Sequence, residues 1–214
     1  MSPPTAPGAA TPAATTGRRG RARQSRRESR ERIVAAATEL VRRRSYSELS
    51  VDEVMREAGL GRTIFYRHFD DMGDLIQRAS REAVEDLLAA QQDLGQARPD
   101  DDPESVRRPF QAAVDVYRRH GPLLRCVAEA ADGDEQIRAN YELMRSRFDE
   151  FAEVSLRGVA DLATTPPADV RETARALNIM GENYLLDVFG REPRVSPETA
   201  VQTLTEIWEA VIRR

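Results

Sequence analysis

Apolar side chains recur at intervals of three and four residues along most of the chain, a spacing typical of amphipathic α-helices. The first such stripe, within residues 29–44, comprises Ile33, Val34, Ala37, Leu40 and Val41. Later stripes predict helices at about residues 71–94, 106–120, 122–131, 135–160, 169–189 and from 197 onward. Alternating runs of β-branched residues, which would indicate strands, are few. The pattern therefore predicts an all-α protein.

Two short helices joined by a tight turn are indicated by S-V-D-E-V-M-R-E-A-G-L-G-R-T-I-F-Y-R-H-F at residues 50–69. Ser50 can cap the first helix, and Glu53 completes a capping box when its carboxylate accepts a hydrogen bond from the backbone N–H of the cap. Gly59 stands where a left-handed residue closes a helix. In the second helix, two phenylalanines lie four residues apart on one face. This arrangement predicts a helix-turn-helix, whose second helix enters the major groove of DNA.

Charge is divided unevenly along the chain, whose formal net charge is −4. Residues 1–69 contain 14 Arg and 7 acidic residues, whereas residues 70–214 contain 18 Arg and 29 acidic residues. The basic part contains the predicted helix-turn-helix. Such an asymmetry is typical of a nucleic-acid-binding end attached to a body with a different role.

Residues 1–24 are rich in Pro, Ala, Thr and Gly and contain few side chains that could form a core. We therefore expect a disordered basic tail. Two interpretations of its arginines remain open: a flexible, solvated segment, or a basic arm that contacts DNA phosphates or the minor groove.

Several classes of protein are excluded by composition. No apolar run approaches the ~20 residues that a membrane span needs, so no membrane partner is expected. Cys126 is the only cysteine and cannot form an internal disulfide, which indicates a reducing, cytoplasmic compartment. With only two histidines and one cysteine, the sequence shows no cluster of metal ligands, so neither a metal site nor a cofactor is expected. No Cys–His or Ser–His–Asp spacing appears, and the chain is not expected to be an enzyme.

A basic packing helix followed by S-V-D-E-V, A-G-L and F-Y-R-H-F occupies about residues 31–75 and resembles the DNA-binding domain of the TetR family of bacterial transcriptional regulators. The resemblance implies a three-helix DNA-binding head at residues 25–72, joined to a larger helical ligand-binding and dimerisation body at residues 73–214. Four positions depart from the family's pattern: Met55, Gly61, Ile64 and Met72. Because Ile64 and Met72 replace the usual phosphate-binding Thr and Lys, neither is expected to contact DNA.

Candidate DNA contacts are concentrated on the second helix of the helix-turn-helix. Arg62, Thr63 and Arg67 are the best candidates for reading bases, because Arg can bind guanine with two hydrogen bonds. Tyr66 shares their outward side and is expected to contact phosphate. His68 is either a DNA contact or a packing residue. The candidate set is completed by Arg43, Arg44 and Ser50, although cations at a helix C-terminus also have a purely structural role.

The last two helices carry a second resemblance. Residues 174–190 and 203–212 resemble the C-terminal part of a subgroup of the same family, the ethionamide-resistance regulators of mycobacteria. This resemblance implies a homodimer formed through the last two helices of each subunit and a narrow apolar pocket in the body. The resemblance depends on Asn178 and Trp208. Gly181 departs from it, because it stands where a second Asn is expected.

Aromatic, Met and Asn side chains in the body are the types that line a small-molecule pocket. The candidate ligand-binding residues are Phe110, Val114, Tyr117, Met144, Phe148, Phe151, Asn178, Ile179, Asn183 and Trp208. Residues of these types also fill ordinary helical cores, so both interpretations remain open.

Taken together, the residues and the resemblance favour a ligand-responsive DNA-binding transcriptional regulator. It is expected to act as a repressor that binds a palindromic double-stranded DNA operator as a dimer and is released by a small apolar effector. The alternative is a helical small-molecule or lipid carrier whose basic N-terminus is incidental. Selective binding of DNA, weakening as salt rises, would distinguish the two.

Overall fold

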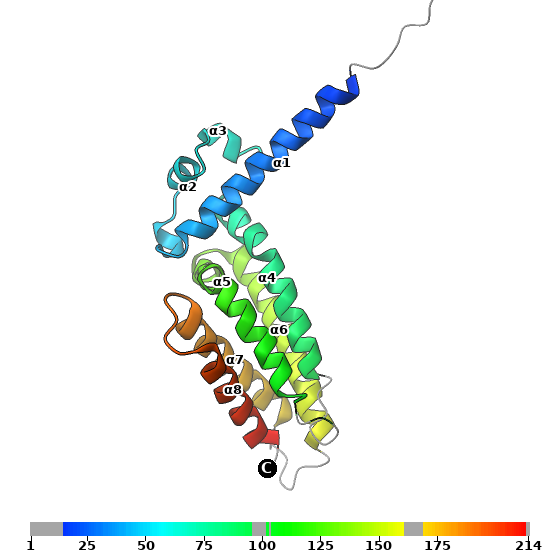
Figure 1. The fold of residues 1–214 in the computed structure, drawn as a ribbon. Helices are drawn as coiled ribbons and strands as arrows, with labels where there is room; N and C mark the ends of the chain where they lie inside the picture. Colours follow the sequence, from blue (N-terminus) through cyan, green and yellow to red (C-terminus); the bar gives the residue numbers. More distant parts are fainter. Residues whose placement is uncertain (1–14, 96–101, 103, 161–168, 213–214) are drawn as a thin grey trace, which may run out of the picture.

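The computed structural model describes residues 15–95, 102, 104–160 and 169–212. The elements in this part of the chain are helices, which confirms the all-α prediction. They are α1 (Thr15–Leu40), the 3₁₀-helix η1 (Tyr46–Glu48), α2 (Val51–Glu57), α3 (Arg62–Phe65), α4 (Met72–Gly95), α5 (Arg107–Gly133), α6 (Glu135–Ala160), α7 (Val170–Phe189) and α8 (Pro197–Ile212). Figure 1 shows a small head, formed by α1 to α3, at one end of a longer body.

The head is held together by apolar side chains from its three helices, the turn after α3 and the start of α4. The buried members of this cluster are Ile33, Ala36, Ala37, Val54, Met55, Ala58, Phe65, Phe69 and Leu75. Ser50 caps α2, because its hydroxyl accepts a hydrogen bond from the backbone N–H of Glu53 at 3.3 Å. The Glu53 carboxylate accepts from the Ser50 hydroxyl at 3.1 Å, rather than from the expected backbone N–H. Gly59 adopts a φ of +62° and closes α2 as predicted.

The first helix is longer than the sequence pattern predicts. α1 begins at Thr15, so residues 15–24 are helical in the structure, whereas we expected them to be disordered. Arg, Ala and Gln favour the helix, and at the end of the segment the side-chain amide of Gln24 donates to Glu28, one turn further along, at 2.9 Å. Low hydrophobicity alone therefore did not predict the state of this segment. Residues 1–14, the remainder of the expected tail, lie outside the described residues.

One long helix replaces two predicted ones in the middle of the body. α5 continues through Pro122, where we expected a break between helices at 106–120 and 122–131. Pro lacks a backbone N–H and disfavours the helix interior. The preceding Gly121 packs directly on the backbone of Phe189, and the residues on both sides of the proline are buried. Tertiary packing on both sides holds the helix together where local propensity would end it.

In the body, α5 packs against α4, α6, α7 and α8, and α6 also packs against α4 and α7 (Figure 1). The bounds of α4, α6, α7 and α8 agree with the predicted ranges. Asp71, Asp169 and Ser196 begin three of these helices by accepting backbone hydrogen bonds at 2.8, 3.0 and 3.1 Å. None of the helices in the described ranges is long and apolar enough to cross a membrane.

Candidate DNA-binding surface and effector cavity

The outward side of α3 and the turn after it presents four candidate DNA contacts. Arg62, Thr63, Tyr66 and Arg67 are exposed, and Tyr66 retains 53% of its surface in contact with solvent. Beneath them, Phe65 and Phe69 are buried, with ring centroids 5.5 Å apart. The apolar pair anchors the short helix, and its polar side remains free to contact DNA.

Arg62 is pre-positioned by its neighbours. Its Nη1 donates to both carboxylate oxygens of Asp52 at 2.9 Å, and its Nη2 donates to the Tyr66 hydroxyl at 3.2 Å. The guanidinium also lies over the Tyr66 ring, 5.8 Å from the centroid. The ion pair is exposed, and exposed pairs contribute little to stability. DNA can therefore displace Asp52 from Arg62 at small cost.

His68 lies at the end of this surface, in a groove between α1 and α4. Burial, together with Arg26, Arg30 and Arg67, holds the pKa of His68 below its usual range, which favours the neutral imidazole near pH 7. The arginines of the groove are Arg23, Arg26, Arg27, Arg30, Arg67, Arg78 and Arg81, opposed by Glu31, Glu82 and Glu85. This basic lining was not predicted from the sequence, because its members come from helices whose separation depends on the fold.

The remaining candidates lie around the end of α1 and the start of α2. Arg43 is exposed and pairs with Glu39 at 3.2 Å, one turn earlier in the chain. Arg44 is 3.7 Å from Glu53, and the Ser50 hydroxyl is engaged in capping. By contrast, Ile64 and Met72 are partly buried and pack against the head's core.

Arg62→Ala and Arg67→Ala are each expected to weaken binding to the cognate operator by roughly 1–3 kcal/mol, because each removes a guanidinium that can grip a base edge. Fluorescence anisotropy with a labelled operator measures the change. Arg157→Ala is the matched control, since Arg157 is an exposed arginine of α6 that pairs with Glu153 on the same helix. Wild-type affinity in both variants would remove these residues as DNA readers.

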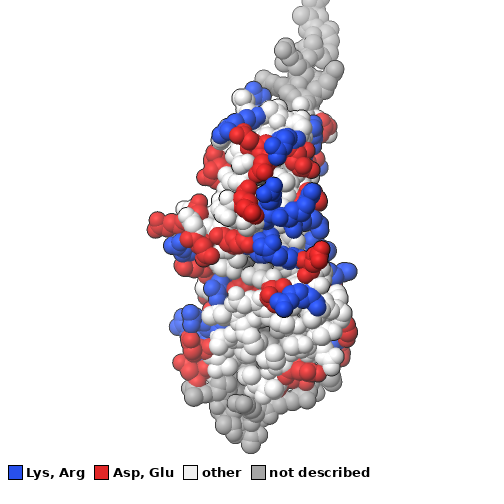
Figure 2. All heavy atoms as spheres, turned by 90° about the vertical axis from the view of Figure 1, so that its left-hand side faces the viewer, with Lys and Arg blue, Asp and Glu red and all other residues white. Residues whose placement is uncertain are grey.

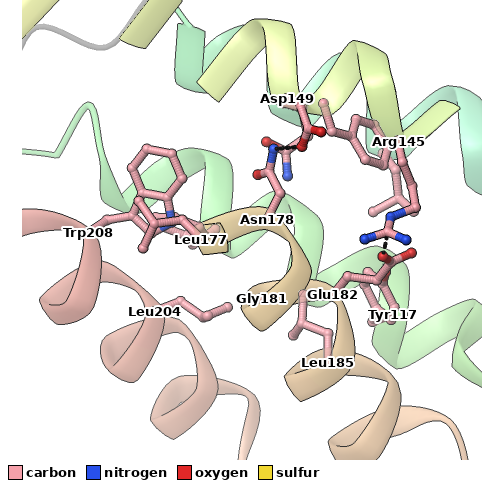
Figure 3. Close-up of a pocket in the computed structure, with 14 residues that line it drawn as sticks. Tyr117, Arg145, Asp149, Leu177, Asn178, Gly181, Glu182, Leu185, Leu204 and Trp208 are labelled. Atoms are coloured by element: carbon pink, nitrogen blue, oxygen red, sulfur yellow. Dashed lines mark hydrogen bonds and ion pairs between the residues drawn. The ribbon is translucent and has the colours of Figure 1, made fainter. Parts of the chain in front are cut away.

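The second candidate site is a small cavity enclosed by α4 to α8, with a volume of about 40 Å³ (Figure 3). One end is apolar, where the rings of Phe110 and Trp208 pack at 5.8 Å. The cavity is lined by Leu87, Gln91, Phe110, Tyr117, Arg145, Phe148, Asp149, Leu177, Asn178, Gly181, Glu182, Leu185, Leu204 and Trp208.

The other end of the cavity is polar. Arg145 pairs with Glu182 at 3.1 Å, and the amide of Asn178 donates to Asp149 at 2.9 Å, as drawn in Figure 3. Burial raises the pKa of Glu182 above its usual range, although its hydrogen bond from Tyr141 and the nearby Arg145 lower it. Burial, reinforced by the nearby Glu182 carboxylate, also raises the pKa of Tyr117 well above its usual range. An apolar end and a polar end are the features by which a site recognises an apolar molecule with one hydrogen-bonding end.

Five of the ten predicted ligand-binding residues line the cavity: Phe110, Tyr117, Phe148, Asn178 and Trp208. The structure places the other five outside it: Val114, Met144, Phe151, Ile179 and Asn183. Val114 is buried elsewhere in the core, and Met144 lines a separate groove between α4 and α6. Asn183 is exposed and donates to the Ile179 carbonyl at 2.7 Å. Residue type identified the apolar end, but the rotation of each helix decided which side chains face inward.

The charged part of the lining was not predicted from the sequence, since the candidate ligand-binding residues included no charged side chain. Gln91, Arg145, Asp149 and Glu182 all belong to the cavity. One signal was available for Glu182, which falls at helical spacing within the buried stripe of α7 formed by Ala174, Leu177 and Leu185. A charged residue within an apolar stripe indicates a buried polar site.

The chain is similar to known proteins in both sequence and fold. Residues 33–79 match the family described as "Bacterial regulatory proteins, tetR family". The chain is 26% identical over 194 residues to the HTH-type transcriptional regulator EthR of Mycolicibacterium smegmatis, which covers 90% of this chain and 89% of EthR. It is 25% identical over 179 residues to EthR of Mycobacterium tuberculosis H37Rv, covering 82% and 83% of the two chains.

Solved structures agree with this comparison. The TetR family transcriptional regulator PfmR from Thermus thermophilus superposes with a TM-score of 0.68 at 21% identity, covering 86% of this chain and 95% of PfmR. NalD, the secondary repressor of the MexAB-OprM multidrug efflux pump in Pseudomonas aeruginosa, superposes with a TM-score of 0.65 at 21% identity, covering 88% of this chain and 98% of NalD. The chain therefore has the fold of TetR family regulators, with a TetR-type N-terminal domain.

Proposed function

We propose that this chain is a ligand-responsive transcriptional repressor that binds a palindromic operator as a homodimer and is released by a small apolar effector. The observation that carries the proposal is the exposed polar side of α3 and the turn after it, with Arg62, Thr63, Tyr66 and Arg67 above a buried aromatic anchor. Docking a helix of this kind in the major groove places these side chains against base edges and phosphates. Residues 25–72 are the DNA-binding head in this proposal, and residues 73–214 the body.

Dimerisation is proposed to use the outer faces of α7 and α8. Figure 2 shows that the lower part of the face turned to the viewer, where α7 and α8 lie, is largely free of charge. Ala176 and Met180 on α7, and Ala210 on α8, are exposed small or apolar side chains. Pairing these helices across a two-fold axis would present two recognition helices to the two halves of a palindrome.

The cavity is proposed to be the effector site, as in a regulator related to EthR. Its lining includes Asn178 and Trp208, the residues on which that resemblance depends. A volume of about 40 Å³ admits only a few water molecules, whereas drug-sized ligands occupy ~300–1,000 Å³. An effector must therefore push the surrounding helices apart. Binding then favours a conformation that differs from this one. The resulting change in operator affinity can be no larger than the difference in the effector's affinity for the two conformations.

The carrier hypothesis is not favoured. It leaves the exposed arginines of the recognition surface, and the match of residues 33–79 to the tetR family of bacterial regulatory proteins, without a role.

A gel-shift titration of genomic fragments at two salt concentrations tests the proposal. The chain is expected to select discrete fragments, and its affinity should fall about 10³-fold between 50 and 200 mM salt if the dimer contacts six or more phosphates. The steep fall reflects counterion release from the DNA backbone. Indifference to DNA at both salt concentrations would contradict the proposal.

A further inference from the structure

A single buried guanidinium joins the head to the far end of α7. Arg125 lies on α5, and its side chain is only 10% exposed. Its Nε donates to the carbonyl oxygen of Gly190 at 2.8 Å, immediately after α7. Its Nη2 donates to the carbonyl oxygens of Val41 and Arg44 at 2.9 and 3.0 Å, at the end of α1. One planar group therefore bonds two segments that are some 150 positions apart in the sequence.

The third nitrogen of the same guanidinium is also engaged. Arg125 Nη1 donates to the carboxylate of Glu129, one turn along α5. The other oxygen of that carboxylate accepts the backbone N–H of Tyr46 at 2.8 Å, in the 3₁₀-helix that leads from α1 to α2. Arg125 and Glu129 together bind the backbone of the segment between α1 and α2, which orients the helix-turn-helix relative to the body.

The end of α7 cannot slide freely past α5. A Cβ placed on Gly121 of α5 would lie 2.2 Å from the Phe189 carbonyl oxygen, so the two backbones are in direct contact. One turn further along α5, Arg125 bonds to Gly190. The cavity residues Asn178 and Glu182 are on the same α7, two to three turns earlier. A helix is stiff over this length, so a displacement of α7 at the cavity moves its end at Arg125.

We propose that Arg125 is a positioning residue through which α7, at the effector cavity, sets the placement of the DNA-binding head. The inference rests on the proposed function, since it describes how that function is regulated. If α7 moves, Arg125 must follow Gly190 or remain with Val41 and Arg44. Either choice leaves buried hydrogen-bonding groups without partners, so the connection has two discrete states rather than a gradual range. A hydrophobic residue would fill the same space without this coupling.

Cys126 provides a reporter of this junction that does not require DNA. It is fully buried beside Arg125, in a cluster with Val41, Ile76 and Leu123. Burial raises the pKa of the Cys126 thiol to about 12, so the thiol stays protonated and unreactive near neutral pH while the junction is closed. As the only cysteine in the chain, it can be labelled with iodoacetamide without ambiguity.

Arg125→Met is expected to raise the rate of Cys126 labelling about tenfold or more, because it removes several charge-assisted hydrogen bonds across the junction. Arg118→Met is the matched control, since Arg118 is exposed on the same helix and pairs with Asp115 one turn away. It should change the rate less than about twofold. If Arg125→Met does not fold, as judged by circular dichroism, Arg125→Lys replaces it: one ammonium cannot reach the carbonyl oxygens at both ends.

Gly181→Leu tests the connection to the cavity. Gly181 lines the cavity, and a Cβ there would meet only Leu204 among the described residues, at 3.9 Å, so the added side chain fills the space and displaces α7 as an effector would. It should raise Cys126 labelling about fivefold in the wild-type background and add little in the Arg125→Met background, as expected for coupled residues. Gly133→Leu, at a glycine with no described neighbour within 4 Å, is the control.

Three labelling results would count against the role of Arg125, and the operator assay tests the proposed function separately. Wild-type labelling in Arg125→Met, or additive effects of Gly181→Leu and Arg125→Met, would overturn the role of Arg125. So would a Gly181→Leu variant with unchanged labelling. In the operator assay, Gly181→Leu should lower affinity about tenfold, and by less than about twofold in the Arg125→Met background. If the labelling results are as expected but neither the wild type nor any variant binds DNA fragments selectively, the role of Arg125 at the junction is supported and the proposed function is wrong.

Discussion

Phe65→Ala is expected to destabilise the head by about 3–5 kcal/mol and to abolish operator binding. Phe65 is fully buried, and its ring contacts those of Tyr66 and Phe69 with centroids 5.3 and 5.5 Å away. α3 is only four residues long, so this anchor, rather than its own hydrogen bonds, holds it against α1 and α2. Urea denaturation followed by circular dichroism measures the loss of unfolding free energy.

Tyr66→Ala is the matched comparison, because it removes the adjacent ring at a position that is 53% exposed. It should change stability by less than about 1 kcal/mol while weakening operator binding. Comparing the two variants distinguishes the buried side of this segment, which supports the fold, from its exposed side, which is proposed to contact DNA. An unchanged urea midpoint in Phe65→Ala would show that the aromatic anchor is not what positions α3.

Gly121→Ala is expected to destabilise the body by about 3 kcal/mol, at the upper end of overpacking costs. The new Cβ would lie 2.2 Å from the carbonyl oxygen of Phe189, which is backbone and cannot rotate away. α5 and α7 must therefore separate along their tightest contact. The loss is diagnostic, since Ala is otherwise favoured over Gly in a helix by about 1 kcal/mol. The shift in urea midpoint measures it.

Gly133→Ala supplies the control with the opposite sign. This glycine is on the same helix, and no described residue lies within 4 Å of the position that its Cβ would take. The substitution should be neutral or stabilise the chain by up to about 1 kcal/mol. Equal effects at the two glycines would mean that helix propensity, and not the contact with α7, determines the result at Gly121.

Local signals predicted most element boundaries, because those signals act within a few residues. Capping by Ser50 and Asp169, and the left-handed Gly59, are present in the structure at the positions that the sequence indicates. Local signals were misleading where packing outweighed them, as at Pro122. They also failed for residues 15–24, where low hydrophobicity predicted disorder but helix propensity and side-chain pairing allow a helix.

The candidate DNA contacts were easier to predict than the cavity. Exposure of Arg62, Thr63 and Tyr66 follows from the spacing of two buried phenylalanines, one at the end of α3 and one four residues later, which is information within the sequence itself. The cavity instead requires side chains from α4 to α8 to converge. Which residues of a stripe face a void depends on the rotation and crossing of each helix, and a one-dimensional pattern does not contain these quantities.

The sequence by itself determined the helical class, the helix-turn-helix and the outward side of its second helix, because periodicity, caps and a tight turn are properties of neighbouring residues. Only the tertiary structure decided that α5 continues through Pro122, that Glu182 and Arg145 form a partly buried pair, and that Arg125 bonds both the end of α1 and the end of α7. Each of these depends on contacts between residues distant in the chain, whose energies exceed local preferences once the helices are packed.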